Sequence, residues 1–230
     1  MTRRNRPPNP FKIAILGMLL AIFANAGAQE LSLPSRSPDL GTADAATLGT
    51  NDDGIGLAAG DGVPAFTSHS VTGEPVHWNE LAQEGPLLVV FYRGGWCPYC
   101  NVQIRQLTLA YPEFEERGIL PVLISADRPD AASLAQNHYE IPFPVLSDPD
   151  LAAHVAFGVT LEVDDETVER YKEYGIDLEA WSGRDHHTIA VSSAFLVDVD
   201  GVVQWAHTSL DYKTRPSPEQ LLDAVGRVDW

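Results

Sequence analysis

The sequence is poor in cysteine and in basic residues. Only 2 cysteines occur among 230 residues, which excludes a small fold held together by several disulfide bonds. The 15 lysines and arginines face 32 aspartates and glutamates, giving a formal net charge of −17 at pH 7. Such a surface repels phosphate groups, so nucleic acids and anionic membrane surfaces are not expected as partners. The chain also has no internal repeat and no signal for an oligomeric state.

The apolar run at residues 13–23 is shorter than the roughly 20 residues that a membrane-spanning helix needs. It follows the basic stretch "MTRRNRPPNPFK" and precedes the small residues of "ANAGAQ". This order is typical of a secretory signal peptide, with cleavage after Ala26 or Ala28. We therefore predict a signal at residues 1–28, an exported and periplasmic protein, and no stable membrane anchor after cleavage; a retained anchor is the alternative.

Two further segments follow the signal. Residues 29–62 are rich in Ser, Thr, Asp, Gly and Pro without a sustained period, which predicts a flexible lead-in. The remaining residues, 63–230, have the length of one domain with one substantial core.

Three continuous apolar runs, at 87–92, 119–125 and 194–199, have the length of strands, and helical patterns lie between them. Runs without alternation are typical of strands covered on both faces. The order predicts an α/β fold with a mixed central sheet flanked by helices. Asp200-Gly201 separates "AFLVDV" from "VVQWAH" and predicts an antiparallel hairpin. Residues 161–187 form an acidic insertion before this last strand pair, with a helix at 164–174.

Both cysteines lie in "VVFYRGGWCPYCNVQ", directly after the first apolar run. Pro98 suits the first position of a helix, which places Cys97 where the helix begins. The side chains that recur at helical spacing after it predict a single buried stripe. This stripe comprises Cys100, Ile104, Leu107, Tyr111 and Phe114.

The cysteine pair has three possible interpretations. A disulfide staple that closes two intervening residues constrains little chain entropy. A structural zinc site needs two more ligands, and nothing repeats the Cys-x-x-Cys spacing. Redox chemistry is favoured because a helix N-terminus stabilises a thiolate, and a second thiol one turn later can resolve the product.

The segments "FYRGGWCPYC", "ILPVLISADRP", "FPVLSDPDLAAHVAFGV" and "AFLVDVDGVVQWAH" resemble, in this order, the peroxiredoxin-like branch of the alkyl hydroperoxide reductase/thiol-specific antioxidant (AhpC/TSA) family. The resemblance covers residues 63–225. It implies a thioredoxin-like fold, reduction of hydroperoxides at a cysteine, a thioredoxin-type protein as reductant, and no bound cofactor or metal.

The same resemblance assigns roles to residues. The family pattern Pro-x-x-x-Thr/Ser-x-x-Cys places Cys100 at the peroxide-attacking position, Cys97 at the Thr/Ser position and Arg93 at the proline. The second arginine of the family falls at Ser192-Ser193. Helix-terminus electrostatics instead favours Cys97 as the first nucleophile, so the order of attack stays open, with both cysteines expected to be essential.

Two neighbours complete the predicted site. Arg93 places a cation near the thiolate, or is a surface arginine paired with an acid. Trp96 shields the cysteine pair, or simply packs the loop on the core.

Three further positions have two interpretations each. Asp127 either caps the next helix or joins a site at the carboxyl end of its strand. His186-His187 either donate protons or belong to a polar loop. Tyr212 and Arg215 are interpreted as leading into the last helix.

The sequence thus predicts a thiol-dependent peroxidase. A periplasmic thiol-disulfide oxidoreductase acting on disulfide substrates is the first alternative, favoured by "WCPYC". A non-enzymatic thioredoxin-fold binding module, docking a partner through the acidic insertion, is the second.

Overall fold

A mixed sheet of seven strands forms the centre of this computed structural model, which describes residues 30–228 and 230. The strands are β1 (Gly41–Thr42), β2 (Thr67–Ser70), β3 (Pro75–His77), β4 (Leu87–Phe91), β5 (Leu120–Ser125), β6 (Val145–Ser147), β7 (Thr160–Glu162), β8 (Thr188–Ala190), β9 (Ser192–Val197), β10 (Val203–Ser209) and β11 (Thr214–Arg215). The helices are the 3-10 helix η1 (Asp52–Gly54), α1 (Trp78–Ala82), α2 (Pro98–Glu116), α3 (Pro129–His138), α4 (Ala152–Phe157), α5 (Asp165–Glu173), α6 (Leu178–Ser182) and α7 (Pro218–Val225).

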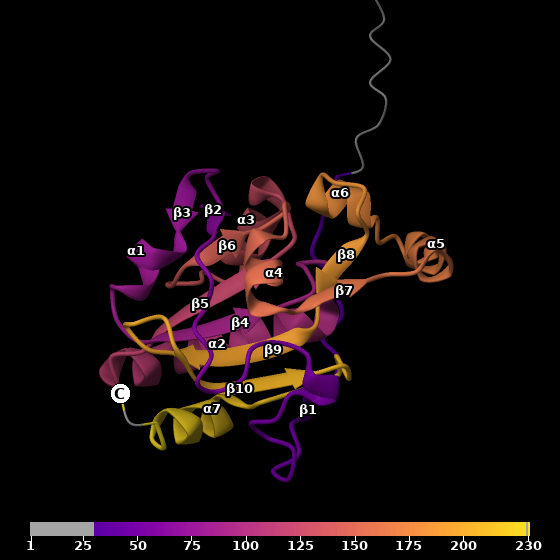
Figure 1. The fold of residues 1–230 in the computed structure, drawn as a ribbon. Coiled ribbons are helices and arrows are strands. Elements are labelled where there is room, and N and C mark those ends of the chain that lie inside the picture. The colour runs from indigo at the N-terminus through magenta and orange to yellow at the C-terminus, as the bar shows by residue number, and fades with distance from the viewer. Residues whose placement is uncertain (1–29, 229) are drawn as a thin grey trace, which may run out of the picture. The chain divides into compact units, whose positions relative to one another are not determined.

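The strand order in the central sheet is β10-β9-β4-β5-β6-β2-β3 (Figure 1). β4, β5 and β6 are parallel, whereas β9, β10, β2 and β3 each run antiparallel to their neighbours. The predicted mixed sheet flanked by helices is therefore present. The carboxyl ends of β4 and β5 lie at one edge, where the loops that follow them meet.

β4 explains why the apolar runs are continuous. Leu88 and Val90 belong to the core shared with α2, α3 and α7, whereas Leu87, Val89 and Phe91 belong to the core shared with α1 and α4. All five side chains are fully buried. A strand covered on both faces needs apolar residues at every position, which confirms the interpretation of the runs.

The hairpin between β9 and β10 is confirmed as well. Gly201 has φ of +75°, a backbone conformation that suits glycine. The Asp198 carboxylate accepts hydrogen bonds from the backbone N–H groups of Asp200, at 3.0 Å, and Val202, at 2.9 Å. These contacts close the turn and place β9 and β10 in antiparallel register.

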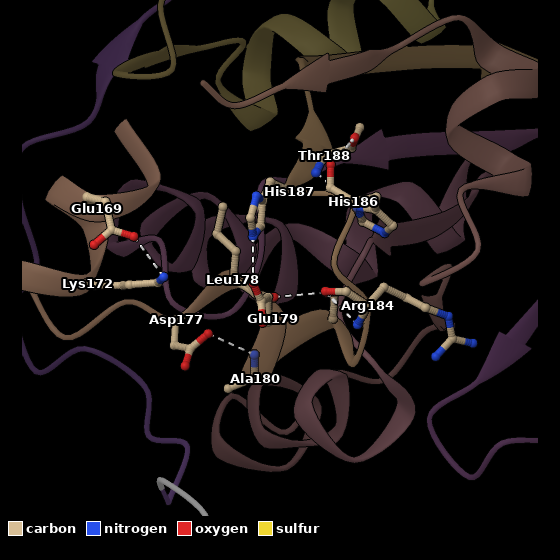
Figure 2. Close-up of polar contacts among 11 residues, drawn as sticks. Glu169, Lys172, Asp177, Leu178, Glu179, Ala180, Arg184, His186, His187 and Thr188 are labelled. Carbon is tan, nitrogen blue, oxygen red and sulfur yellow. Dashed lines mark hydrogen bonds and ion pairs between the residues drawn. The ribbon is translucent and has the colours of Figure 1, made fainter. Parts of the chain in front are cut away.

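The acidic insertion lies between the antiparallel strands β7 and β8 and contains α5 and α6. Asp164 caps α5 by accepting a hydrogen bond from the Thr167 N–H at 2.9 Å, as expected for a helix at 164–174. Asp177 caps α6 in the same way, through the Ala180 N–H (Figure 2). Each helix therefore begins at an acidic cap.

Residues 31–62 belong to the same compact unit as residues 63–230. β1 pairs in parallel with β11, and the Ala43 N–H donates to the Arg215 carbonyl at 2.7 Å. The predicted flexibility of this lead-in stays a prediction. The predicted signal peptide, residues 1–28, lies outside the described residues, and among the described residues no helix is long and apolar enough to cross a bilayer.

Candidate active site

The two cysteines lie where β4 leads into α2. Cys97 is the N-cap of α2, with φ −88° and ψ 112°, and Pro98 occupies the first helical position. The Asn101 N–H donates to the Cys97 carbonyl at 3.1 Å, which starts the helical hydrogen bonding. The predicted start of the helix at the cysteine pair is confirmed.

Two side chains hold the loop before Cys97. The Gly95 N–H donates to the Asp127 carboxylate at 2.8 Å, and the Asn101 side-chain amide donates to the Gly95 carbonyl at 2.8 Å. Gly94 has φ of +146°, and a Cβ there would lie 2.8 Å from Asp127 Oδ1. Only glycine fits this close approach, so the loop is set against the end of β5.

Both cysteines are buried free thiols, with Cys97 1% exposed and Cys100 not exposed. The pKa of Cys97 is raised well above its usual value because its thiol donates a hydrogen bond to Cys100 and because it is buried. Burial also opposes ionisation of Cys100. It is outweighed by the hydrogen bond from Cys97, the charge of Arg215, and the backbone N–H and charge of Arg93, which together lower the pKa of Cys100 to about 6. Cys100 is therefore the thiolate of the pair at neutral pH, and Cys97 carries the proton.

Arg215 brings a second cation to this site, and the sequence reasoning missed it. Its side chain is 3% exposed, and Nη2 lies 3.8 Å from Cys100 Sγ as a hydrogen-bond donor. Nε donates to Gln103 Oε1 at 3.2 Å, and Nη1 donates to the Thr214 carbonyl at 2.8 Å. An arginine thus lies beside Cys100, although this chain has serines at 192–193, where the family has its second arginine.

Arg93 is buried in an aromatic cage and is not a surface arginine. Its guanidinium carbon lies 4.2 Å from the centre of the Tyr212 ring, 5.3 Å from Trp96 and 5.8 Å from Tyr171. Nη2 donates a hydrogen bond to the Tyr171 hydroxyl. Among the described residues no carboxylate forms an ion pair with Arg93, so its charge is available to the thiolate and to bound molecules.

A pocket of about 600 Å³ opens beside this cage, and Cys97 forms part of its wall. Trp96 lines the same pocket while its own side chain is 6% exposed, and its shielding of the cysteine pair stays a prediction. Cys97 is among the residues that line the pocket, whereas Cys100 is not. The sulfur that a solute meets first is therefore that of Cys97. The complete lining is Pro34, Ser35, Arg36, Arg93, Trp96, Cys97, Pro98, Tyr99, Tyr171, Tyr174, Ile176, Tyr212 and Lys213.

Asp127 belongs to the site and does not cap α3, whose N-cap is Arg128. It is 2% exposed, and burial raises its pKa to about 7, against the lowering effects of the Gly95 N–H and Ser125 hydrogen bonds. The negative charge of Cys100 raises the pKa further. The helix-cap interpretation of Asp127 was wrong because its carboxylate accepts a hydrogen bond from the Gly95 N–H, in the loop before Cys97, and not from α3.

The two adjacent histidines are held by loop contacts (Figure 2). His186 Nδ1 accepts the Thr188 N–H at 2.9 Å, while Nε2 lies 3.0 Å from the Pro149 carbonyl. His187 Nε2 lies 2.8 Å from Glu179 Oε1 on α6. Neither histidine lines the pocket that Cys97 borders, but both line a small cavity together with Arg93, Trp96 and Asp127. A role as proton donors therefore stays a prediction.

The comparison with known proteins agrees with this geometry. A family model described as the AhpC/TSA family matches residues 59–206, well over half of the chain. The chain belongs to the AhpC/TSA family. Peroxiredoxin Bcp of Escherichia coli (strain K12) is 30% identical over 167 residues, which cover 73% of this chain and 94% of that protein. The predicted class, a peroxiredoxin-type oxidoreductase, is confirmed at the level of the family.

Two further comparisons concern the fold and the alternative activity. The crystal structure of peroxidoxin BcpB from Mycobacterium tuberculosis superposes with a TM-score of 0.59 at 19% identity, covering 76% of this chain and 99% of that one. This likeness confirms the thioredoxin-like fold. The thiol-disulfide oxidoreductase ResA of Halalkalibacterium halodurans is 26% identical over 102 residues, 44% of this chain and 57% of that protein.

Proposed function

We propose that the protein is a thiol-dependent peroxidase that reduces hydroperoxides through Cys97 and Cys100. The observation that carries this proposal is the Cys100 sulfur, which lies beside the buried Arg215 and has its pKa lowered to about 6. A thiolate is the form of cysteine that attacks peroxide. A protonated partner, Cys97, lies within hydrogen-bond reach to complete the cycle.

In the proposed cycle, the Cys100 thiolate attacks the terminal oxygen of the hydroperoxide, the oxygen that carries the hydrogen. The O–O bond breaks, the peroxide takes two electrons, and its leaving oxygen takes a proton and departs as an alcohol or water. Cys100 is left as a sulfenic acid. The Cys97 sulfur then attacks the Cys100 sulfur, water leaves, and a disulfide forms. An external dithiol protein of the thioredoxin type reduces this disulfide by thiol exchange.

Acidity and access favour different cysteines as the first nucleophile. Cys100 has the lowered pKa, whereas Cys97 borders the pocket. We propose Cys100, because a thiol whose pKa is raised is a poor nucleophile at neutral pH even where solvent reaches it. The peroxide then passes Cys97 to reach its target.

The test is consumption of hydroperoxide by the purified protein with a thioredoxin-type reductant, comparing the parent with Cys97→Ser and Cys100→Ser. Cys100→Ser should abolish even the first turnover, while Cys97→Ser should complete one turnover and then stop. The reverse pattern would assign the attack to Cys97. No turnover above background in the parent protein would overturn the proposal.

A thiol-disulfide oxidoreductase is the second candidate, supported by the local likeness to ResA and by the Cys-Pro-Tyr-Cys sequence. In this case Cys97 at the pocket wall would attack the disulfide substrate. Catalysed reduction of insulin disulfides, together with peroxide turnover no faster than that of a free dithiol, would replace the peroxidase proposal with this one.

We also propose that residues 1–28 direct export to the periplasm and are removed. The basic, apolar and small-residue order of this segment supports the proposal. Sequencing the N-terminus of the protein recovered from the periplasmic fraction should show a start at residue 27 or 29. Retention of Met1 on a cytoplasmic protein would contradict it.

A further inference from the structure

The pocket beside Cys97 has an unusual charge for this chain. The protein has about twice as many acidic as basic residues, 32 against 15, yet the lining of this pocket contains three bases and no acid. The three bases are Arg36, Arg93 and Lys213. A concave surface with one sign of charge attracts solutes of the opposite sign. The pocket is therefore built for an anion although the molecule as a whole repels anions.

Arg93 is the buried base of the three, with an exposed fraction of 8%, and it adds to the positive charge of the pocket. Its Nε has no hydrogen-bond partner, and its contacts are the ring faces of Tyr212, Trp96 and Tyr171 and the Tyr171 hydroxyl. A cation kept away from water without a full set of acceptors costs free energy until a partner satisfies it. Arg93 therefore contributes a positive charge with an unpartnered N–H group to the wall of the pocket.

The walls of the pocket are rich in aromatic side chains. Five aromatic side chains contribute to them, and Tyr99 and Trp96 are themselves packed edge-on or tilted against tyrosines of the same wall. The five are Trp96, Tyr99, Tyr171, Tyr174 and Tyr212. Such walls bind a ring or a hydrocarbon body rather than a small polar solute.

The volume of the pocket also favours an organic ligand over hydrogen peroxide. Its volume of about 600 Å³ lies in the range of pockets that hold organic ligands, about 300–1,000 Å³. Hydrogen peroxide needs only about the volume of two waters, each of about 30 Å³. Most of the space would stay filled with water if hydrogen peroxide were the substrate for which the pocket is shaped.

From these observations we infer that the pocket selects organic hydroperoxides that carry a carboxylate on an apolar body. The body lies between the aromatic walls, the carboxylate faces Arg36 and Lys213 at the exposed rim, and the peroxide group reaches past Cys97. Arg36 comes from the lead-in segment and Tyr171 and Tyr174 from the insertion around α5, so segments outside the β4–α2 junction set this specificity. The inference deepens the proposed function and, for its hydroperoxide part, rests on it.

The first experiment compares two hydroperoxides that differ only in charge, cumene hydroperoxide and its para-carboxylated analogue. The carboxylated substrate should have a kcat/KM several-fold higher. Arg36→Gln and Lys213→Gln should each reduce this preference, by up to about fivefold as for an exposed ion pair. Arg117→Gln, which removes an exposed arginine at the far end of α2, is the matched control and should leave the preference unchanged.

The second experiment needs no turnover. Isothermal titration of the reduced protein with 4-isopropylbenzoate should show binding, weakened in Arg36→Gln and Lys213→Gln but not in Arg117→Gln, whereas neutral 4-isopropylbenzamide should bind more weakly. Peroxidase activity without any preference for the carboxylate, or equal binding of acid and amide, would overturn the inference and leave the proposed function intact. Carboxylate binding without any peroxide turnover would keep the anion site and overturn the peroxidase.

Discussion

Arg215 is the cation whose charge contributes most to the lowered pKa of Cys100. Its guanidinium is buried and its contacts are neutral acceptors apart from the Cys100 sulfur. An opposite charge at this range favours the ionised form of a thiol. The thiolate and the arginine therefore stabilise one another where neither could be buried alone.

Replacing Arg215 by Gln should raise the pKa of Cys100 by on the order of 1–2 units, because the nearest cation is lost. The measurement is the rate of iodoacetamide alkylation at Cys100 as a function of pH, with the modified peptide identified by mass spectrometry. Arg215→Lys, which keeps a charge but loses the planar donor, should give an intermediate value. An unchanged profile in Arg215→Gln would show that the Cys97 hydrogen bond and Arg93 hold the thiolate without Arg215.

Asp127 should make stability depend on pH. Its pKa is raised in the folded protein from 3.8 to about 7 by burial, so the folded state prefers the protonated form. This stabilisation is fully present below pH 3.8 and is lost as pH rises through 7. Relative to Asp127→Asn, which does not titrate but keeps an acceptor for the Gly95 N–H, the wild type should lose up to about 4 kcal/mol between pH 4 and 8.

Urea unfolding of both proteins across this pH range measures the difference. The exposed Asp39→Asn serves as the control and should follow the wild-type curve. Parallel curves for the wild type and Asp127→Asn would contradict the assignment of a raised pKa to this carboxyl.

Among the elements, β1 connects the lead-in to the site, because it pairs with β11 and β11 carries Arg215. Gly41 in β1 packs closely on its partner: a Cβ there would lie 2.9 Å from the Thr214 methyl group and 3.3 Å from the Lys213 carbonyl. The short lead-in strand therefore helps to place a charged group of the active site.

Gly41→Val should push β11 away from β1 and displace Arg215. We expect a peroxidase rate several-fold lower and a higher pKa of Cys100, with a cost in global stability of on the order of 1 kcal/mol because both strands are short. Gly62→Val is the matched control, since a Cβ at Gly62 meets nothing within 4 Å. Equal activities for the two variants would indicate that β1 does not position Arg215.

Most elements were predictable from the sequence because interactions among a few neighbouring residues determine them. The uninterrupted apolar runs became β4, β5 and β9, the Asp200-Gly201 pair became the β9–β10 turn, and Pro98 marked the start of α2. These signals are contained in a few consecutive residues. The lead-in gave no such signal, because β1 is two residues long and exists through its pairing with β11, which is distant in sequence.

The site was predictable only in part for the same reason. Cys97, Cys100, Arg93 and Trp96 lie in one short segment, so a single motif brings them together. Arg215 comes from a polar stretch 115 residues after Cys100, and no spacing rule connects the two. One signal was present: Arg215 lies two residues before a capped helix start, in a chain short of basic residues.

For the molecule as a whole, oxidation of the cysteine pair should change stability in a pH-dependent way. A disulfide that closes two intervening residues adds only about 2 kcal/mol by chain entropy. The reduced protein instead gains from Cys100, whose folded pKa of about 6 lies below its unfolded value of 9.0. This contribution is fully present above pH 9 and is lost as pH falls through 6.

The free energy of unfolding of the reduced protein should therefore rise relative to that of the oxidised protein between pH 6 and 9, by about 1.4 kcal/mol per unit. Urea denaturation of both forms, with and without a reductant, measures this. The double Cys→Ser variant lacks both contributions and should follow the pH dependence of the oxidised form. A constant difference between the two forms would argue against an ionised Cys100.

The most direct measurement combines thiol counting with sulfenic acid trapping after one equivalent of hydroperoxide. The wild type should lose two free thiols and give a Cys97–Cys100 disulfide in the peptide map. Cys97→Ser should give a dimedone adduct on Cys100, and Cys100→Ser should give no adduct. Two intact thiols in the wild type after this treatment, or an adduct on Cys97 in Cys100→Ser, would contradict the proposal that the Cys100 thiolate attacks peroxide and Cys97 resolves the product.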